Sequence, residues 1–235
     1  MNTPQHPIEY NNNLYKEIST SIIPSDFMKN PHVNILDIGC GYGGLLFSMS
    51  EYLEKTNDLG YGMEIRDKVT NYAGERLYTL RLNSGNTKYN NISFVRTNTM
   101  KLLLNYFYKG QIDKMFFCFA DPHFKKNNHK KRIINKYLLN DYSYLLKIGG
   151  ILYSITDVKD LHIWHRTILN QNPCFSEISI DELEKDPFLQ FMKNTDEARK
   201  VIRNKGNMYY TAYRRVEPKI NSLDQLYDIL SEDES

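Results

Sequence analysis

Val33-Asn34-Ile35-Leu36-Asp37-Ile38-Gly39-Cys40-Gly41-Tyr42-Gly43-Gly44 joins an apolar run to a glycine-rich turn near the start of the chain. The run over residues 33–38 predicts a buried strand that begins after Pro31 and ends at Gly39, and residues 44–54 predict a helix. Glycines at such a turn let the backbone bend tightly and approach a ligand closely. The stretch is typical of the first strand, turn and helix of an α/β sheet.

The pattern of a strand followed by a helix repeats along the chain. Further strands are predicted over residues 59–65, 92–95, 112–119 and 151–155. Further helices are predicted over residues 67–82, 100–108 and 161–169, with another around residues 138–146 that Gly149-Gly150 close. The alternation implies right-handed crossovers and a parallel sheet. Two late strands, over residues 175–180 and 208–215, are expected to pair antiparallel.

Composition excludes several classes of protein. Hydrophobic residues make up 41% of the 235-residue chain and charged residues 25%, so disorder throughout is excluded. No apolar run approaches the ~18 residues that a membrane span needs, and residues 1–13 lack the apolar segment of a secretion signal. The three cysteines, Cys40, Cys118 and Cys174, form no Cys-x-x-Cys pair. We therefore expect neither a metal site nor a disulfide framework.

The formal net charge of +2 hides an uneven distribution. Residues 221–235 contain acidic residues but no lysine or arginine, so the rest of the chain is more basic than the total suggests. The basic residues concentrate in two clusters: Lys125, Lys126, Lys130, Lys131 and Arg132, and then Arg199, Lys200, Arg203, Lys205, Arg214 and Arg215. A nucleic-acid binder needs such clusters, although an ordinary solvated surface also carries them.

The glycine turn fits two kinds of cofactor. Gly39, Gly41 and Gly44 satisfy the G-x-G-x-x-G spacing of dinucleotide binders, and Glu64 follows where an acid that binds a ribose is expected. However, Asp37 lies two residues before Gly39 and would repel a pyrophosphate. The same acid suits the ammonium and sulfonium groups of S-adenosylmethionine. The turn therefore favours S-adenosylmethionine without excluding a dinucleotide.

A second cluster of chemically able residues follows the strand over residues 112–119. Asp121, His123 and Phe124 come directly after this apolar run and lead into the basic cluster that ends at Arg132. Each has an ordinary interpretation, since an acid followed by proline often starts a turn. Ligands of open α/β sheets bind outside the carboxyl ends of strands, so the combination predicts a cleft for a nucleobase carried by a polyanion.

A third candidate lies late in the chain, where Thr195-Asp196-Glu197 opens a charged helix. A threonine followed by acids is a normal helix start. The same residues can also reach back over the cofactor, and both interpretations stay open.

These segments resemble the tRNA (guanine-N7-)-methyltransferase family in its eukaryotic form. The matching segments are 37–46, 62–66, 98–101, 115–132, 149–164 and 195–197. The most specific is Phe119-Ala120-Asp121-Pro122-His123-Phe124-Lys125, followed by His129-Lys130-Lys131-Arg132. The resemblance implies a Rossmann-like class I methyltransferase fold: a seven-stranded, mostly parallel sheet with helices on both faces and an antiparallel last strand. It also implies a methyltransferase domain over residues 31–216, between an N-terminal arm with a leading helix (1–30) and an acidic tail (217–235).

The resemblance also implies roles for individual residues. Asp121 matches the residue with the catalytic role, and the cofactor is S-adenosyl-L-methionine, which leaves as S-adenosyl-L-homocysteine. The implied cofactor contacts are Gly39, Gly41, Glu64, Arg66, Asn98, Thr99, Cys118, Thr195 and Glu197. The expected contacts with the RNA backbone are Lys125, Lys126, His129, Lys130 and Arg132.

The chain departs from the family pattern at a few positions. Ala120 replaces the proline that usually precedes the aspartate, and Thr99 stands where the family often has alanine. The spacing from Gly39 to Glu64 is slightly longer than in familiar members. The arm before the first strand is short and matches poorly.

The resemblance predicts an enzyme that forms 7-methylguanosine in the variable loop of tRNA, at guanine 46 in tRNA numbering. It also predicts a WD-repeat, non-catalytic partner subunit, and a location in the nucleus and in the cytoplasm as well. Three alternatives stay open: a non-catalytic RNA-binding scaffold with this fold, a dinucleotide-dependent oxidoreductase, and guanine-N7 methylation of another RNA.

Overall fold

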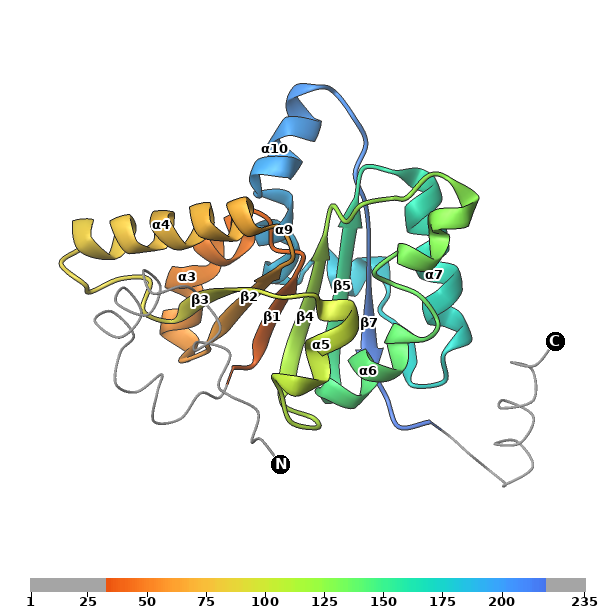
Figure 1. Cartoon of the computed structure of the whole chain (residues 1–235). Coiled ribbons are helices and arrows are strands. Elements are labelled where there is room, and N and C mark those ends of the chain that lie inside the picture. Colours follow the sequence, from red (N-terminus) through yellow and green to blue (C-terminus); the bar gives the residue numbers. More distant parts are fainter. Residues whose placement is uncertain (1–32, 219–235) are drawn as a thin grey trace.

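A seven-stranded sheet with helices on both faces organises the chain (Figure 1). The computed structural model describes residues 33–218. The arm predicted for residues 1–30 and most of the tail predicted for residues 217–235 lie outside this range. The order of the strands across the sheet is β3-β2-β1-β4-β5-β7-β6.

The strands run mostly parallel, as the sequence predicts. Their bounds are β1 Ile35–Ile38, β2 Gly60–Glu64, β3 Ile92–Arg96, β4 Ile112–Cys118, β5 Leu146–Thr156, β6 Phe175–Glu177 and β7 Tyr209–Arg215. Strands β3, β2, β1, β4 and β5 pair in parallel, and β7 pairs antiparallel with both β5 and β6. The predicted mostly parallel sheet with an antiparallel last strand is confirmed. The carboxyl ends of the parallel strands therefore form one edge.

Helices connect the strands. Their bounds are α3 Gly44–Thr56, α4 Asp67–Asn83, α5 Thr99–Leu102, η2 Leu103–Asn105, η3 Lys126–Lys131, α6 Leu138–Leu145, α7 Lys159–Gln171, α8 Ile180–Leu183, α9 Pro187–Lys193 and α10 Asp196–Arg203. Side chains of η2, α6 and α7 pack in one buried cluster, and those of α3, α4 and α9 pack in another. The predicted cover on both faces of the sheet is confirmed.

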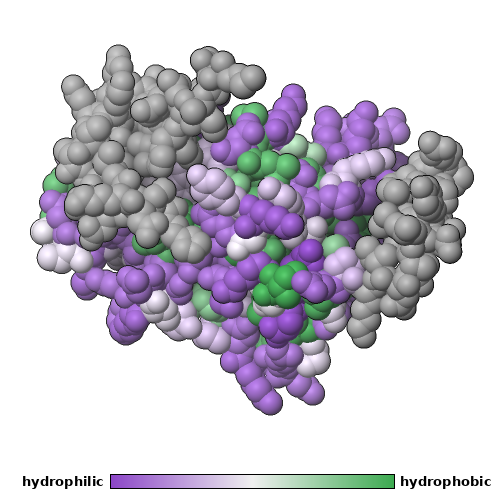
Figure 2. Space-filling model, turned by 90° about the horizontal axis from the view of Figure 1, so that it is seen from below, coloured by the Kyte–Doolittle hydropathy of each residue, from purple (hydrophilic) through white to green (hydrophobic). Residues whose placement is uncertain are grey.

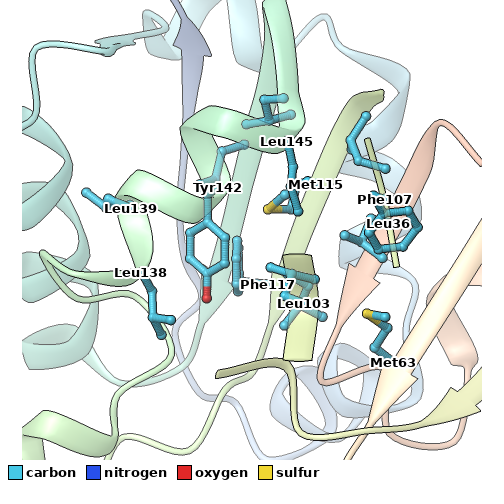
Figure 3. Packing of buried hydrophobic residues seen from close by; sticks show 14 of the residues in the cluster. Leu36, Met63, Leu103, Phe107, Met115, Phe117, Leu138, Leu139, Tyr142 and Leu145 are labelled. Atoms are coloured by element: carbon cyan, nitrogen blue, oxygen red, sulfur yellow. The ribbon is translucent and has the colours of Figure 1, made fainter. Parts of the chain in front are cut away.

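Strand β4 contributes to both clusters because its side chains alternate between the two faces. Met115 and Phe117 point into the first cluster, where Tyr142 of α6 packs on Phe117 (Figure 3). Phe116 points the other way and stacks on Tyr153 of β5, with ring centroids 4.7 Å apart. The strand is thus fixed between two apolar layers, and its carboxyl end has a defined position in the sheet.

The prediction that Gly149-Gly150 close a helix is wrong, because α6 ends at Leu145 and both glycines lie inside β5. The register between β4 and β5 shifts near Ile112, which marks a bulge. Gly149 has φ +84°, and a Cβ on Gly150 would lie 3.0 Å from the carbonyl oxygen of Asp113. The glycines therefore permit a close backbone approach within a continuous strand.

The chain between β6 and β7 is more helical than expected. Strand β6 ends at Glu177, short of the predicted residue 180, because Ser179 accepts a hydrogen bond from the N–H of Glu182 and begins α8. Asp186 caps α9 in the same way and is followed by Pro187. These short helices carry the chain back to the carboxyl edge, where α10 begins (Figure 1).

The opposite edge, at the amino ends of the parallel strands, is seen from below in Figure 2. Its visible surface is largely hydrophilic, with a few hydrophobic patches (Figure 2). Among residues 33–218, no helix is both long and apolar enough to cross a membrane.

Candidate active site

The glycine turn between β1 and α3 has a conformation that few other residues can adopt. Gly39, Gly41 and Gly43 have φ values of +75°, +54° and +79°. A Cβ on Gly43 would also overlap the ring of Phe94. The N–H of Gly41 donates to Oε2 of Glu64 over 3.1 Å, which ties the turn to the end of β2. The turn is therefore held open at the carboxyl edge of the sheet.

Glu64 is an ionised, fixed acceptor beside this turn. Its side chain is 4% exposed, and Oε1 accepts hydrogen bonds from the N–H groups of Ile65 and Arg66 over 2.9 Å each. The guanidinium of Arg66 donates to both carboxylate oxygens over 3.1 Å. Burial raises the pKa of Glu64, but the bonds from Arg66 outweigh burial and hold the pKa below its usual value. A charged acceptor in this place suits the hydroxyls of a ribose.

Asp37 lies beneath the same turn, at the carboxyl end of β1. It is 1% exposed, and among the described residues its Oδ1 has no hydrogen-bond partner. Burial, then Glu197, then Glu64 raise the pKa of Asp37 to about 8. A buried acid without a partner is costly, and an incoming cation would compensate it. The acids around the turn therefore fit the cationic end of S-adenosylmethionine.

The raised pKa has a consequence for stability. The pKa of Asp37 lies above the ordinary value of 3.8, so the folded state holds this proton more tightly than the unfolded chain does. The contribution is full below pH ~4 and is lost as the pH rises through about 8. We expect the free energy of unfolding of Asp37→Asn to rise by about 1–3 kcal/mol relative to that of the wild type as the pH increases from 5 to 8.5. Thermal unfolding of the unliganded proteins measures this, and parallel pH profiles would contradict it.

The start of α10 packs against the other side of the glycine turn. Thr195 caps this helix, since its hydroxyl accepts from the N–H of Ala198 over 3.2 Å, and the predicted cap is confirmed. Oε1 of Glu197 lies 3.7 Å from the position of a Cβ on Gly41, and the N–H of Asp196 lies 3.6 Å from that of a Cβ on Gly44. Thr195 therefore caps α10, and the first turn of the same helix lies beside the glycine turn.

The remaining candidate cofactor residues lie along the same edge. Asn98 and Thr99 follow β3, and the N–H of Thr97 donates to the carbonyl oxygen of Glu64 over 2.9 Å. Cys118 ends β4 on the far side of β1, where burial, then Asp37, raise the pKa of its thiol. The neighbouring strands β3, β2, β1 and β4 thus bring these residues into one row.

Asp121 lies in the loop that leaves β4, next to β1 in the sheet. Its side chain is 72% exposed, and its Oδ1 accepts a hydrogen bond from the N–H of His123 over 3.0 Å. Phe119 and His123 adopt left-handed φ values of 53° and 44°, which non-glycine residues rarely do. Such conformations cost about 1–3 kcal/mol each and cluster at functional sites. The carboxylate is thus held by a strained turn at the carboxyl edge.

Arg132 does not lie on the basic surface, which corrects the expectation that it contacts an RNA backbone. It is 6% exposed, and its Nε donates to the carbonyl oxygen of Pro122 over 2.9 Å. Its guanidinium lies 4.7 Å from the ring centre of Trp164, and the half-buried His129 contacts the same ring. Arg132 therefore anchors the loop of Asp121 to α7. The exposed members of the cluster are Lys125, Lys126, Lys130 and Lys131.

The anchoring role of Arg132 predicts a loss of stability on Arg132→Ala. The change removes a hydrogen bond from a charged donor and a cation–π contact. We expect the free energy of unfolding to fall by about 2–3 kcal/mol. Chemical denaturation measures it, with Lys131→Ala as the matched control because Lys131 is adjacent and exposed. Equal effects of the two substitutions would contradict the role of Arg132.

Trp164 supports the site but was given no role of its own from the sequence. Trp164 donates from Nε1 to the carbonyl oxygen of Ile134 over 2.8 Å and carries Arg132 on its ring. Asp196 contacts Arg76 of α4 over 3.8 Å. No local pattern marks Trp164, since its partners are distant in sequence, whereas Asp196 belongs to the predicted helix start. Among the described residues, no three His, Cys, Asp or Glu side chains gather as a metal site.

Comparisons with known proteins place the chain among methyltransferases. A family model described as "Putative methyltransferase" matches residues 31–211. A protein of Arabidopsis thaliana is 48% identical over 78% of this chain and 73% of its own length. Proteins of Drosophila willistoni and Bombyx mori are 43% and 42% identical over 86% and 92% of this chain, and over 81% and 88% of their own lengths. All three are named tRNA (guanine-N(7)-)-methyltransferase.

Solved structures support the fold alone. An antibiotic-related methyltransferase superposes with a TM-score of 0.53 at 13% identity, over 89% of this chain and 98% of its own. The aminoglycoside resistance methyltransferase NpmB1 superposes with a TM-score of 0.51 at 10% identity, over 83% of this chain and 94% of its own.

Proposed function

This chain belongs to the tRNA (guanine-N7-)-methyltransferase family, and from this we propose that it methylates guanine N7 in the variable loop of tRNA with S-adenosylmethionine. The observation that carries the proposal is the group of acids around the glycine turn. Asp37, Glu64 and Glu197 all face this turn. A cofactor with a cationic end fits there, whereas the pyrophosphate of a dinucleotide would meet these acids. The arrangement therefore counts against the oxidoreductase alternative.

Each part of the cofactor has residues that would hold it. Glu64 would accept hydrogen bonds from the ribose hydroxyls, and Asn98 and Thr99 would border the adenine at the end of β3. Asp37 would face the cationic end, and Glu197 would cover the turn from α10. When bound, S-adenosylmethionine supplies an electrophilic methyl group on a positively charged sulfur.

The chain's own task in the reaction is to position the base. Guanine N7 carries a lone pair and no proton, so no general base is needed at that atom. Holding two reactants in line contributes up to ~7–11 kcal/mol to lowering the barrier. The methylated ring is cationic, so the carboxylate of Asp121 stabilises the charge that develops in the transition state. Asp121 would also accept hydrogen bonds from the Watson–Crick edge of the guanine. Its strained turn and the anchor of Arg132 fix this carboxylate at the edge of the sheet.

The exposed lysines beside Asp121 suit the phosphates of the RNA. They lie on η3 and immediately before it. Replacing Lys125, Lys126 and Lys130 by alanine should weaken tRNA binding and lower the slope of log affinity against log salt by about 3, roughly one for each lost phosphate contact. Fluorescence titration with tRNA at several salt concentrations measures both quantities.

A matched triple variant gives the control for this titration. Lys55 lies in the last turn of α3, and Lys88 and Lys109 lie in the loops before β3 and β4, so all three are exposed toward the amino edge of the sheet. Their replacement by alanine should leave the slope unchanged. If both triple variants lost the same slope, the η3 lysines would be part of a general charge effect and not of an RNA site.

The product and its position test the proposed function. Total tRNA is methylated with labelled cofactor and then cleaved with borohydride and aniline, which break the chain at 7-methylguanosine. We expect cleavage in the variable loop. Labelling without cleavage there would point to another position or another RNA. No labelling, with and without a WD-repeat partner, would favour the non-catalytic scaffold.

The partner and the location in the cell are proposed from the resemblance to eukaryotic members alone. We infer a WD-repeat partner that supports the activity on tRNA, and a nuclear location with a cytoplasmic fraction. The exposed lysines Lys125, Lys126, Lys130 and Lys131 can serve as an import signal as well as an RNA contact. Replacing these four lysines by alanine and following both the location and the tRNA affinity separates these two roles.

A further inference from the structure

A buried acid that would face the cationic end of the cofactor, but has no part in the proposed methyl transfer, lies at the centre of the site. Asp37 is 1% exposed, and among the described residues its Oδ1 has no hydrogen-bond partner. The proposed mechanism gives it no contact with the guanine, whereas Glu64 anchors the turn through the N–H of Gly41. A carboxyl group retained in such a place loses hydration without compensation from the protein. Its environment therefore indicates which ligand would compensate it.

The groups that face Asp37 come from every neighbouring element at this edge. Glu64 faces it from β2 and Glu197 from α10, and both raise its pKa. The thiols of Cys118 on β4 and Cys40 in the glycine turn also interact with it, and their pKa values are raised in part by Asp37. The acids around Asp37 thus outnumber the cations that the structure places close to it.

Within residues 33–218, the cation beside the glycine turn, Arg66, is already engaged. Arg66 donates to both carboxylate oxygens of Glu64, so its charge serves that acid first. Asp37 is therefore disposed to keep a proton until a cation arrives from outside the chain. The two ligands of this site differ in this respect, because S-adenosylmethionine carries a charged sulfur and S-adenosylhomocysteine a neutral one, while both carry the same amino acid end.

We propose that Asp37 is the residue by which the site distinguishes the methylated cofactor from its demethylated product, by releasing a proton when the charged sulfur binds and regaining it after the methyl group has left. This inference rests on the proposed function, because it takes S-adenosylmethionine as the ligand of the glycine turn.

Protons, bonds and charge balance over the cycle. Binding of the sulfonium releases the proton of Asp37 to water, and the carboxylate then faces a positive sulfur. Methyl transfer forms the carbon–nitrogen bond at N7 and breaks the carbon–sulfur bond, whose electron pair stays on sulfur. The sulfur becomes neutral and the guanine ring becomes cationic. Asp37 takes a proton back from water, loses its charged partner, and holds the product less tightly than the substrate.

This exchange makes the preference for the charged ligand depend on pH. The pKa of Asp37 is about 8 without a ligand, so near neutral pH most molecules must give up this proton on binding. As the pH rises toward about 8, the dissociation constant of S-adenosylmethionine should therefore fall relative to that of S-adenosylhomocysteine, by up to tenfold for each pH unit. Above that pH the ratio should become constant.

Calorimetry of the intact protein in buffers with different ionisation enthalpies measures the protons directly. At pH 7 we expect close to one proton to be released with S-adenosylmethionine and almost none with S-adenosylhomocysteine. Equal proton release for both ligands, or a preference that does not change between pH 6 and 7.5, would overturn the inference. Failure of either ligand to bind would instead overturn the proposed function.

Asp37→Asn separates the proton released by Asp37 from any proton released by the amino group of the ligand. The variant should show no difference in proton release between the two ligands. At pH 7.5 its preference for S-adenosylmethionine over S-adenosylhomocysteine should be at least tenfold weaker than that of the wild type. Glu51→Gln removes an exposed acid on α3 and should change neither quantity. If Asp37→Asn kept the full pH-dependent preference, the inference would fail. If the variant did not fold, the wild-type measurements above would still decide.

Discussion

Asp121→Asn should lower kcat by about 10²–10³-fold and leave the dissociation constant of the cofactor within about twofold. The substitution keeps the shape of the side chain, and its amide oxygen still accepts the hydrogen bond from the N–H of His123 that shapes the loop. What it removes is the negative charge opposite the ring that becomes cationic. Single-turnover methylation of tRNA measures the chemical step, and calorimetry measures cofactor binding.

Two further variants make this result specific. Asp181→Asn removes an exposed acid on α8 and should not change the rate. His123→Ala keeps the N–H but loses the side chain that lies 3.6 Å from the carboxylate, so it should reduce the rate less than Asp121→Asn. An equal loss of turnover and cofactor affinity in Asp121→Asn would show that the residue supports the fold of the site and not the transition state.

Glu64→Gln should have the opposite signature, with the dissociation constant of S-adenosylmethionine raised by about 100-fold and kcat at saturating cofactor much less affected. Glu64 accepts bonds from the N–H of Gly41 and from Arg66, so its charge both shapes the turn and binds the ribose. Each hydrogen bond to a charged group contributes ~1.5–3 kcal/mol. Because the carboxylate of Glu64 accepts several such bonds, replacing it by a neutral amide weakens all of them together.

The control for Glu64→Gln is Glu51→Gln, because the exposed carboxylate of Glu51 pairs with Lys55 on the surface of α3, away from the glycine turn. This variant should bind the cofactor like the wild type. If Glu64→Gln also bound the cofactor normally, the ribose would have to lie elsewhere, and the row of carboxyl ends from β3 to β4 would not be the cofactor site.

The sequence predicts the parts of this fold that depend on local pattern. The strand before Gly39, the turn and the helix after it follow from apolar runs and glycine spacing, and the structure has them within two residues. Alternation of strands and helices likewise predicts the parallel order of the sheet. These features are encoded within short windows of the chain.

Features that depend on distant partners could not be predicted in the same way. Arg132 looks like one more member of a basic run, but the carbonyl of Pro122 and the ring of Trp164 draw it inside. Gly149-Gly150 look like a helix end, but the close approach of β4 to β5 requires them within a strand. In both cases a tertiary contact outweighs the local pattern.

A crystal structure of the protein with S-adenosylhomocysteine and a guanosine ligand would show whether the two acids, Glu64 and Asp121, share one pocket. We expect the ribose hydroxyls to bind Glu64, the sulfur to lie beside the glycine turn above Asp37, and the carboxylate of Asp121 to contact the guanine within the same pocket. A carboxylate of Asp121 directed into solvent, or a guanosine bound on the other side of the sheet from the adenosine, would contradict it.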